Sequence, residues 1–141
     1  MDESILTIKE AGEKLASGEL TAEALTRSCL DAIEQGDTDV KAFLSVSETA
    51  LEEARAIDAR RAAGESLGPL AGIPVGVKDV ILVQDWETTG GSQILEGYNA
   101  PYDATAIARL RAAGAILLGR TNCDEFAMGS SNETSYFGIT A

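Results

Sequence analysis

The chain contains no histidine, and it is poor in cations, cysteines and aromatic residues. Without histidine it lacks the commonest general base and the commonest metal ligand of proteins, so any catalysis must use another base. Its 11 lysines and arginines are outnumbered by 23 aspartates and glutamates, and the net charge is -12. Because phosphate contacts need clustered cations, so acidic a chain is a poor candidate for holding a nucleic acid by itself. If a nucleic acid is involved, we expect a partner to hold it.

Long apolar stretches are also missing. The longest, residues 115–118, is far too short to span a bilayer, and the acidic N-terminus lacks the basic region and apolar core of a secretory signal. In a chain without an export signal, Cys29 and Cys123 indicate reduced thiols. The 141 residues, 45% of them apolar, are enough for one domain with a core. We therefore expect a cytoplasmic, single-domain protein with no membrane association.

Capping signals predict that residues 1–65 form helices. Thr7 and Ser45 are each followed by a glutamate three positions later, which is the capping-box spacing, and Thr21 is a further N-cap candidate. Apolar residues recur at helical spacing after each of these positions. Gly36 is expected to end the helix that begins after Thr21.

The pattern changes period in the second region, residues 72–141. Apolar residues alternate with proline, glycine and lysine over residues 73–78, which predicts a strand. A helix is expected between Asp103 as its cap and Gly114 as its end, followed by a short apolar strand at residues 115–119. Alternating helices and strands favour an α/β fold.

Lys78 stands at the end of a stretch of apolar and very small residues. In a strand its side chain shares a face with Pro74 and Gly76, and these small neighbours leave room for the lysine to run inward. Removing an ammonium from water favours its neutral form, which is how a lysine becomes a base near neutral pH. The alternative is a lysine that pairs with Asp79 or reaches solvent at the strand end. The short stretch by itself favours this alternative.

A lysine base needs a nucleophile, and Ser/Lys pairs are an alternative to Ser/His/Asp triads. Ser92 and the pair Ser130–Ser131 each follow a glycine and are candidates, but glycine–serine clusters are also common in ordinary loops. No nucleophile elbow, Walker motif or dinucleotide fingerprint occurs. From the residues alone, the site is incomplete.

Several segments together resemble the amidase signature family. GIPVGVKD (residues 72–79) resembles its lysine-bearing strand, and LGRTNCDEFAMGSSNETSYFG (residues 118–138) is similar to a segment of its glutamyl-tRNA(Gln) amidotransferase branch. Residues 98–119 and LASGELTAEAL near the N-terminus resemble that branch as well. The resemblance implies N-terminal helices followed by the start of an α/β/α fold with a central mixed sheet. Residues 1–141 would then be the N-terminal part of a single amidase domain.

The resemblance implies a Ser-cis-Ser-Lys triad in which Lys78 is the base. Both serines of that triad are expected beyond Ala141, so the chain by itself is expected to be inactive, and none of its own serines is assigned as the nucleophile. The resemblance also implies that Met128, Gly129 and Ser130 lie beside the pocket that binds the amide.

The implied reaction hydrolyses glutamine to glutamate and ammonia. The ammonia would pass to a partner subunit that uses ATP and magnesium to convert Glu-tRNA(Gln) to Gln-tRNA(Gln). The implied partners are glutamine as substrate, the two other subunits of a heterotrimer, and tRNA contacted mainly through a partner. No cofactor or metal is expected in this chain. Two alternatives stay open: a stand-alone amidase of the same family that acts on a small carboxamide, and a non-catalytic helical assembly module.

Overall fold

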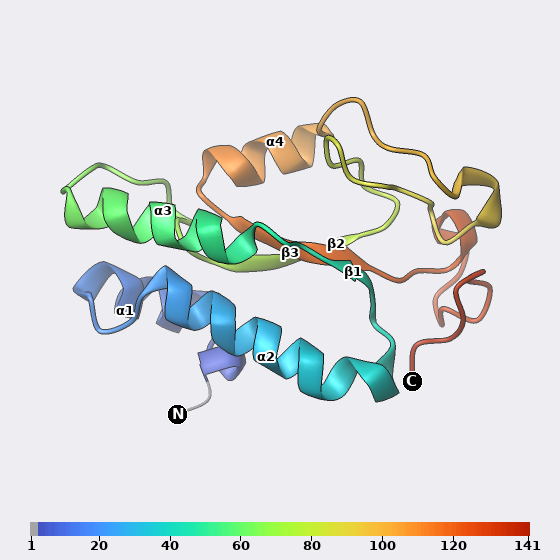
Figure 1. Ribbon diagram of the computed structural model, residues 1–141, viewed down its shortest axis with the longest axis horizontal. Coiled ribbons are helices and arrows are strands. Elements are labelled where there is room, and N and C mark those ends of the chain that lie inside the picture. Colours follow the sequence, from blue (N-terminus) through green and yellow to red (C-terminus); the bar gives the residue numbers. More distant parts are fainter. Residues whose placement is uncertain (1–2) are drawn as a thin grey trace. The chain divides into compact units, whose positions relative to one another are not determined.

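The computed structural model describes residues 3–141, drawn in Figure 1. Helices and strands both occur along it, which confirms the predicted α/β class. The α-helices of these residues are α1 (Ile8–Ser17), α2 (Ala22–Val40), α3 (Ala50–Ala62) and α4 (Thr105–Ala112). Their strands are β1 (Phe43–Val46), β2 (Pro74–Lys78) and β3 (Ile116–Thr121), and short 3-10 helices lie at Glu3–Ile5, Gln93–Leu95 and Glu125–Ala127. No helix within residues 3–141 is long and apolar enough to cross a bilayer.

The described chain divides into two compact units. Unit 1 comprises the residues up to Gln35, together with Ser47–Val75 and Leu110–Leu118. Unit 2 comprises Gly36–Val46, Gly76–Arg109 and Gly119–Ala141. All of the predicted site residues belong to unit 2.

The strands form one sheet in the order β1–β3–β2. β1 runs antiparallel to β3. The N–H of Ile116 donates to the carbonyl of Ile73 at 2.9 Å, and the N–H of Asp79 donates to the carbonyl of Thr121 at 3.0 Å. From the first bond to the second, the residue number rises along both strands, so β2 and β3 are parallel. Parallel strands require a crossover connection, and α4 lies in it. The sheet is therefore mixed, and the two strands predicted from the apolar pattern are confirmed.

The first predicted helix, α1, has the expected capping box. The hydroxyl of Thr7 accepts the N–H of Glu10 at 3.2 Å, and the carboxylate of Glu10 accepts the N–H of Thr7 at 2.9 Å. Ala11 and Leu15 are buried one turn apart, and Gly18 ends the helix in the left-handed conformation at φ 77°.

The second helix, α2, continues past its expected end. Thr21 caps it as predicted, since its hydroxyl accepts the N–H of Ala24 at 3.1 Å. Gly36 does not end it, because the left-handed residue that follows the helix is Lys41, at φ 58°. The last turn instead places Asp37 so that its carboxylate accepts the N–H of Ala42 at 2.7 Å. A glycine inside a helix costs about 1 kcal/mol relative to alanine, which contacts such as this one offset.

The prediction that residues 1–65 are helical is wrong at residues 43–46. Ser45 lies in β1 and caps no helix, and α3 begins at Ala50 after Thr49. β1 pairs with β3, where Ser45 lies opposite Arg120. A four-residue strand is stabilised by such a distant partner, and no local pattern reveals that partner.

The interiors of the two units differ in chemistry. Unit 1 buries mainly apolar side chains, from the helices and from the first half of β3. Unit 2 buries a set of polar and charged side chains, namely Asp79, Thr88, Thr89, Ser92, Arg120 and Asp124. Buried polar groups are costly unless they are hydrogen-bonded, so the interior of unit 2 requires a specific network. Two of these residues adjoin the predicted site: Asp79 follows Lys78 in the sequence, and the carboxylate of Asp124 lies beside Gly129.

Candidate active site

Lys78 is the last residue of β2, and its side chain is exposed. Gly76 is exposed on the same face, whereas Val77 between them is only 3% exposed. The alternative in which Lys78 reaches solvent at the strand end is therefore confirmed, and the expectation that it runs inward is wrong, because the face with Val77 is the one turned to the interior. Within residues 3–141, no hydrogen bond or ion pair holds its ammonium. The catalytic role of Lys78 stays a prediction.

Asp79, the residue after Lys78, is fully buried. Its carboxylate accepts a hydrogen bond from Nη1 of Arg120 at 2.6 Å. It also accepts the backbone N–H of Thr89 at 3.2 Å and that of Gly91 at 3.1 Å, and the hydroxyl of Thr89 donates to it as well. The alternative in which Lys78 pairs with Asp79 is therefore wrong, because the carboxylate is occupied by Arg120 and the two loop residues.

Arg120 joins this carboxylate to two other parts of unit 2. Its side chain is 9% exposed. Nε donates to the hydroxyl of Ser45 in β1 at 3.0 Å, and Nη2 lies 3.5 Å from the carboxylate of Glu87. The planar guanidinium carries several donors in a rigid fork, so one side chain can link three elements. Sequence reasoning missed the pair of Asp79 with Arg120, and the available signal was a cation at the end of the apolar run that forms β3.

The backbone around Lys78 is held on both sides. Its carbonyl accepts the N–H of Ile81 at 2.9 Å. The N–H of Asp79 donates to Thr121 in β3, and the carbonyl of Asp79 accepts the N–H of Gly90 at 3.1 Å. The position of Lys78 is therefore determined by backbone hydrogen bonds and by its buried neighbour Asp79, and not by contacts of its own side chain.

Ser92, one of the three serine candidates, has a structural role. It is 2% exposed, and its hydroxyl donates to the carboxylate of Glu125 at 2.6 Å while it accepts the N–H of Ile94 at 3.4 Å. This agrees with leaving Ser92 unassigned as a nucleophile. Ser130 and Ser131 are exposed, and the hydroxyl of Ser131 donates to Glu133 at 2.7 Å.

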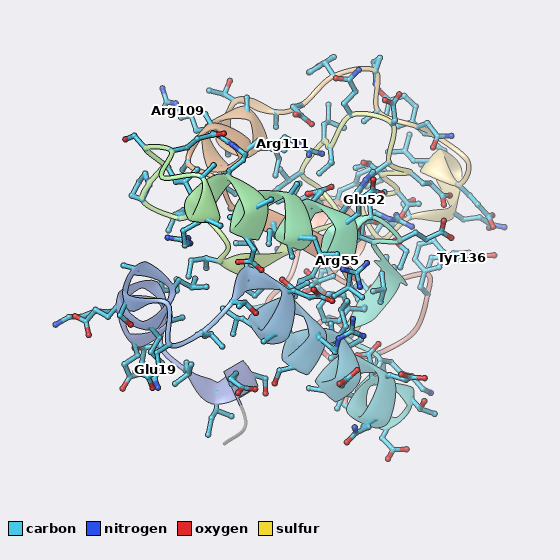
Figure 2. The ribbon with its side chains drawn as sticks, turned by 60° about the vertical axis from the view of Figure 1, so that its left-hand side comes forward. Glu19, Glu52, Arg55, Arg109, Arg111 and Tyr136 are labelled. Atoms are coloured by element: carbon cyan, nitrogen blue, oxygen red, sulfur yellow. The ribbon has the colours of Figure 1, made fainter. Side chains whose placement is uncertain are left out.

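The turn before Ser92 connects the Lys78 strand to the second predicted part of the site. Gly90 and Gly91 are left-handed, at φ 63° and 68°. The carbonyl of Gly90 accepts the N–H of Phe126 at 2.7 Å, and that of Gly91 accepts the N–H of Tyr136 at 2.9 Å. The side chain of Tyr136, labelled in Figure 2, is 51% exposed, so its backbone makes this connection. Asp79 is therefore hydrogen-bonded to the Gly90–Gly91 turn, and that turn is hydrogen-bonded to the segment around residues 124–136.

Met128, Gly129 and Ser130 lie exposed in the loop that follows the 3-10 helix Glu125–Ala127. A Cβ atom at Gly129 would lie 2.5 Å from Oδ1 of Asp124, so any side chain there would have to displace that carboxylate. Within residues 3–141, no hydrogen bond joins these three residues to Lys78. Their contact with an amide substrate stays a prediction.

Two buried groups beside these segments have shifted pKa values. Burial raises the pKa of the Cys123 thiol, the charge of Asp79 raises it further, and the ammonium of Lys78 opposes both. The backbone N–H of Asn132 lowers the pKa of Asp124 from its ordinary value of 3.8, aided by the hydroxyl of Thr134 and opposed by burial. Cys123 therefore lies within electrostatic reach of Lys78, and Asp124 stays ionised at neutral pH.

The fold and sequence match the amidase family. The family model, described as Amidase, matches residues 24–141, and the chain belongs to that family. The A subunit of glutamyl-tRNA(Gln) amidotransferase from Thermobifida fusca (strain YX) is 56% identical over 96% of this chain, which spans 27% of that protein.

Solved structures of the family have the same fold. The A subunit of glutamyl-tRNA(Gln) amidotransferase from Thermotoga maritima is 39% identical with a TM-score of 0.78, and the match covers 99% of this chain and 28% of that one. The native peptide amidase from Stenotrophomonas maltophilia is 33% identical with a TM-score of 0.86, covering 97% of this chain and 29% of that one. The chain thus spans little more than a quarter of the relatives that it matches.

Proposed function

We propose that the chain is part of the glutaminase subunit of a glutamyl-tRNA(Gln) amidotransferase. The observation that carries this proposal is the 56% identity, over 96% of the chain, to the amidotransferase protein of Thermobifida fusca. The peptide amidase is less similar in sequence, at 33%. Within one family the fold is shared, so sequence identity is the better guide to the branch.

Lys78 acts in this proposal as the base of a Ser-cis-Ser-Lys triad. Its amine takes a proton from a bridging serine, which takes one from the serine nucleophile. The nucleophile attacks the carboxamide carbon of glutamine, and the relay returns the proton to the amide nitrogen, which leaves as ammonia. Water then hydrolyses the acyl ester to glutamate and restores the serine hydroxyl. Both serines belong to the remainder of the full-length protein. The exposed side chain of Lys78 at a fixed strand end supports the proposal, because a group from another segment can reach it.

Met128, Gly129 and Ser130 lie beside the substrate carboxamide in this proposal. Ammonia passes to a partner subunit, which uses ATP and magnesium to amidate Glu-tRNA(Gln), and the complex is a heterotrimer. The net charge of -12 supports this division of labour, because an acidic chain leaves the tRNA and ATP to a partner.

The test uses the full-length protein assembled with its two partner subunits. Release of glutamate and ammonia from glutamine is measured for wild type and for Lys78→Ala, which is expected to lose activity by at least about 10³-fold. Lys9→Ala is the control, since Lys9 is an exposed lysine in α1 whose nearest partner is Glu13 at 3.9 Å. Wild-type activity in Lys78→Ala would refute the role of the lysine and favour the assembly module. Residues 1–141 alone are expected to be inactive, because they supply a base without its nucleophile.

A stand-alone amidase is the second candidate, and the TM-score of 0.86 with the peptide amidase, against 0.78 with the amidotransferase protein, is the observation that favours it. A glutaminase subunit should co-purify with two partners and support ATP-dependent formation of Gln-tRNA(Gln). An amidase should hydrolyse small carboxamides without partners, tRNA or ATP.

A further inference from the structure

The carboxylate of Asp124 closes the loop that carries Met128–Ser130. One oxygen accepts the N–H of Asn132 at 2.9 Å. The other accepts the hydroxyl of Thr134 at 2.9 Å and the N–H of Thr134 at 3.3 Å. The side chain that begins the loop therefore binds the backbone eight and ten residues later.

Thr134 ties the same two ends together a second time. Its hydroxyl accepts the N–H of Glu125 at 3.1 Å while donating to Asp124. Asp124 is 6% exposed, whereas Thr134 is exposed, so the carboxylate is the buried partner of these bonds. The two ends of the loop are thus joined, and the segment between them is held as a closed turn.

The tip of this loop is exposed and conformationally restricted. Met128 is 73% exposed. Phe126 and Ala127 both have positive φ, at 51° and 59°, although neither is a glycine. Two successive non-glycine residues in the left-handed region are unfavourable, and surrounding contacts must hold them there. Asp124 supplies such contacts, since its backbone carbonyl also accepts the N–H of Ala127 at 2.8 Å.

Gly129 shows that the carboxylate lies directly behind the tip. An added Cβ at Gly129 would lie 2.5 Å from Oδ1 and 2.6 Å from Oδ2 of Asp124. The carboxylate therefore lies against the inner side of the loop, while the loop presents Met128–Ser130 outward.

We propose that Asp124 is a positioning residue that sets the affinity for the carboxamide substrate by holding Met128–Ser130 in their binding conformation. This inference rests on the proposed function. Asp124 touches the loop and not Lys78, so its loss should weaken substrate binding and leave the chemical step of bound substrate largely unchanged.

The experiment measures KM and kcat for glutamine hydrolysis by the full-length protein in its complex. Asp124→Asn keeps the size of the side chain but replaces one accepting oxygen with an NH₂ group that faces N–H or O–H donors. We expect its KM to rise about tenfold or more, with kcat within about threefold of wild type. Thr134→Val, which removes the bridging hydroxyl, should raise KM about threefold, and Thr134→Ser, which keeps it, should restore the wild-type KM.

Glu133→Gln is the matched control in the same loop, because Glu133 is exposed and, within residues 3–141, its carboxylate accepts a hydrogen bond only from Ser131. Its KM should equal that of wild type. The proposal is overturned if Asp124→Asn leaves KM unchanged, if it lowers kcat alone, or if Thr134→Ser and Thr134→Val behave alike. If the wild-type protein hydrolyses small carboxamides but not glutamine, only the glutaminase assignment is refuted. The KM values of the same variants are then compared with the small carboxamide as substrate. Wild type without any amidase activity refutes both.

Discussion

Asp79 and Arg120 form a buried ion pair, with Oδ1 of the carboxylate 2.6 Å from Nη1 of the guanidinium. The side chain of Asp79 is 0% exposed and that of Arg120 is 9% exposed. The pair joins the residue after Lys78 to β3, and its two members lie 41 positions apart in the sequence. Because each charge is removed from water, each depends on the other.

Replacing Arg120 with methionine should therefore destabilise the protein strongly. The substitution leaves the Asp79 carboxylate buried without its cation, which costs about 3–5 kcal/mol in comparable cases. The free energy of unfolding, measured with urea, tests this. Arg55→Met is the control, because Arg55 (labelled in Figure 2) pairs with Glu23 at 2.8 Å on the exposed side of α3 and its loss should change little. Equal effects of the two substitutions would contradict the importance of the buried pair.

Gly91→Ala should be far more damaging than Gly97→Ala. Both glycines have positive φ, at 68° and 80°, so alanine meets a similar backbone cost of about 1–2 kcal/mol at either position. At Gly91 the new Cβ would also lie 2.6 Å from the carbonyl oxygen of Cys123, whereas at Gly97 nothing lies within 4 Å. Thermal unfolding of the two variants compares them directly. A Gly97→Ala variant that is as unstable as Gly91→Ala would show that the contact with Cys123 is unimportant.

Cys123 should react slowly with thiol reagents in the native protein. It is 4% exposed, and burial together with the charge of Asp79 raises the pKa of its thiol above the ordinary value of 9.0. The reactive thiolate is therefore scarce at about pH 8, and access is poor. Alkylation with iodoacetamide followed by mass spectrometry should show Cys29, which is half-buried, modified before Cys123. In denaturant, Cys29 and Cys123 should be modified at similar rates. Slower modification of Cys123 in denaturant as well would contradict this explanation.

The stabilisation from Asp124 should depend on pH in a predictable direction. Its pKa is lowered in the folded protein, chiefly by the N–H of Asn132, from the ordinary 3.8 that the unfolded chain has. A lowered pKa contributes stability that is fully present above 3.8 and is lost as the pH falls through the folded value. The difference in unfolding free energy between wild type and Asp124→Asn should therefore be constant from about pH 6 to 5 and shrink below about 3.8. A difference that instead grows as the pH falls from about 6 to 4 would indicate a raised pKa.

Local signals were the most reliable guide to the fold. The spacing of Thr7 and Glu10 predicted a capping box that the structure contains, and the alternation over residues 73–78 predicted β2. These features depend on residues within one turn or one strand. The prediction that Gly36 ends a helix was wrong, because a glycine permits a helix to end but does not require it. The left-handed residue after α2 is Lys41.

Distant contacts decided the features that local reasoning missed. Phe43–Val46 form a strand only because β3 lies beside them, and Ser45 contacts Arg120 from there. The role of Asp79 could not be inferred from its neighbour Lys78, because its partners Thr89, Gly91 and Arg120 are brought to it by the fold.

By itself, the sequence determined the α/β class, the N-caps of α1 and α2, the apolar strands and the family, because each of these is recorded in neighbouring residues or in motif identity. Only the tertiary structure decided that Lys78 is exposed on a strand end fixed by a buried ion pair, and that Asp124 closes the loop carrying Met128–Ser130. The physical reason is that buried charges take the partners that folding places within hydrogen-bond distance, and sequence separation does not limit that choice.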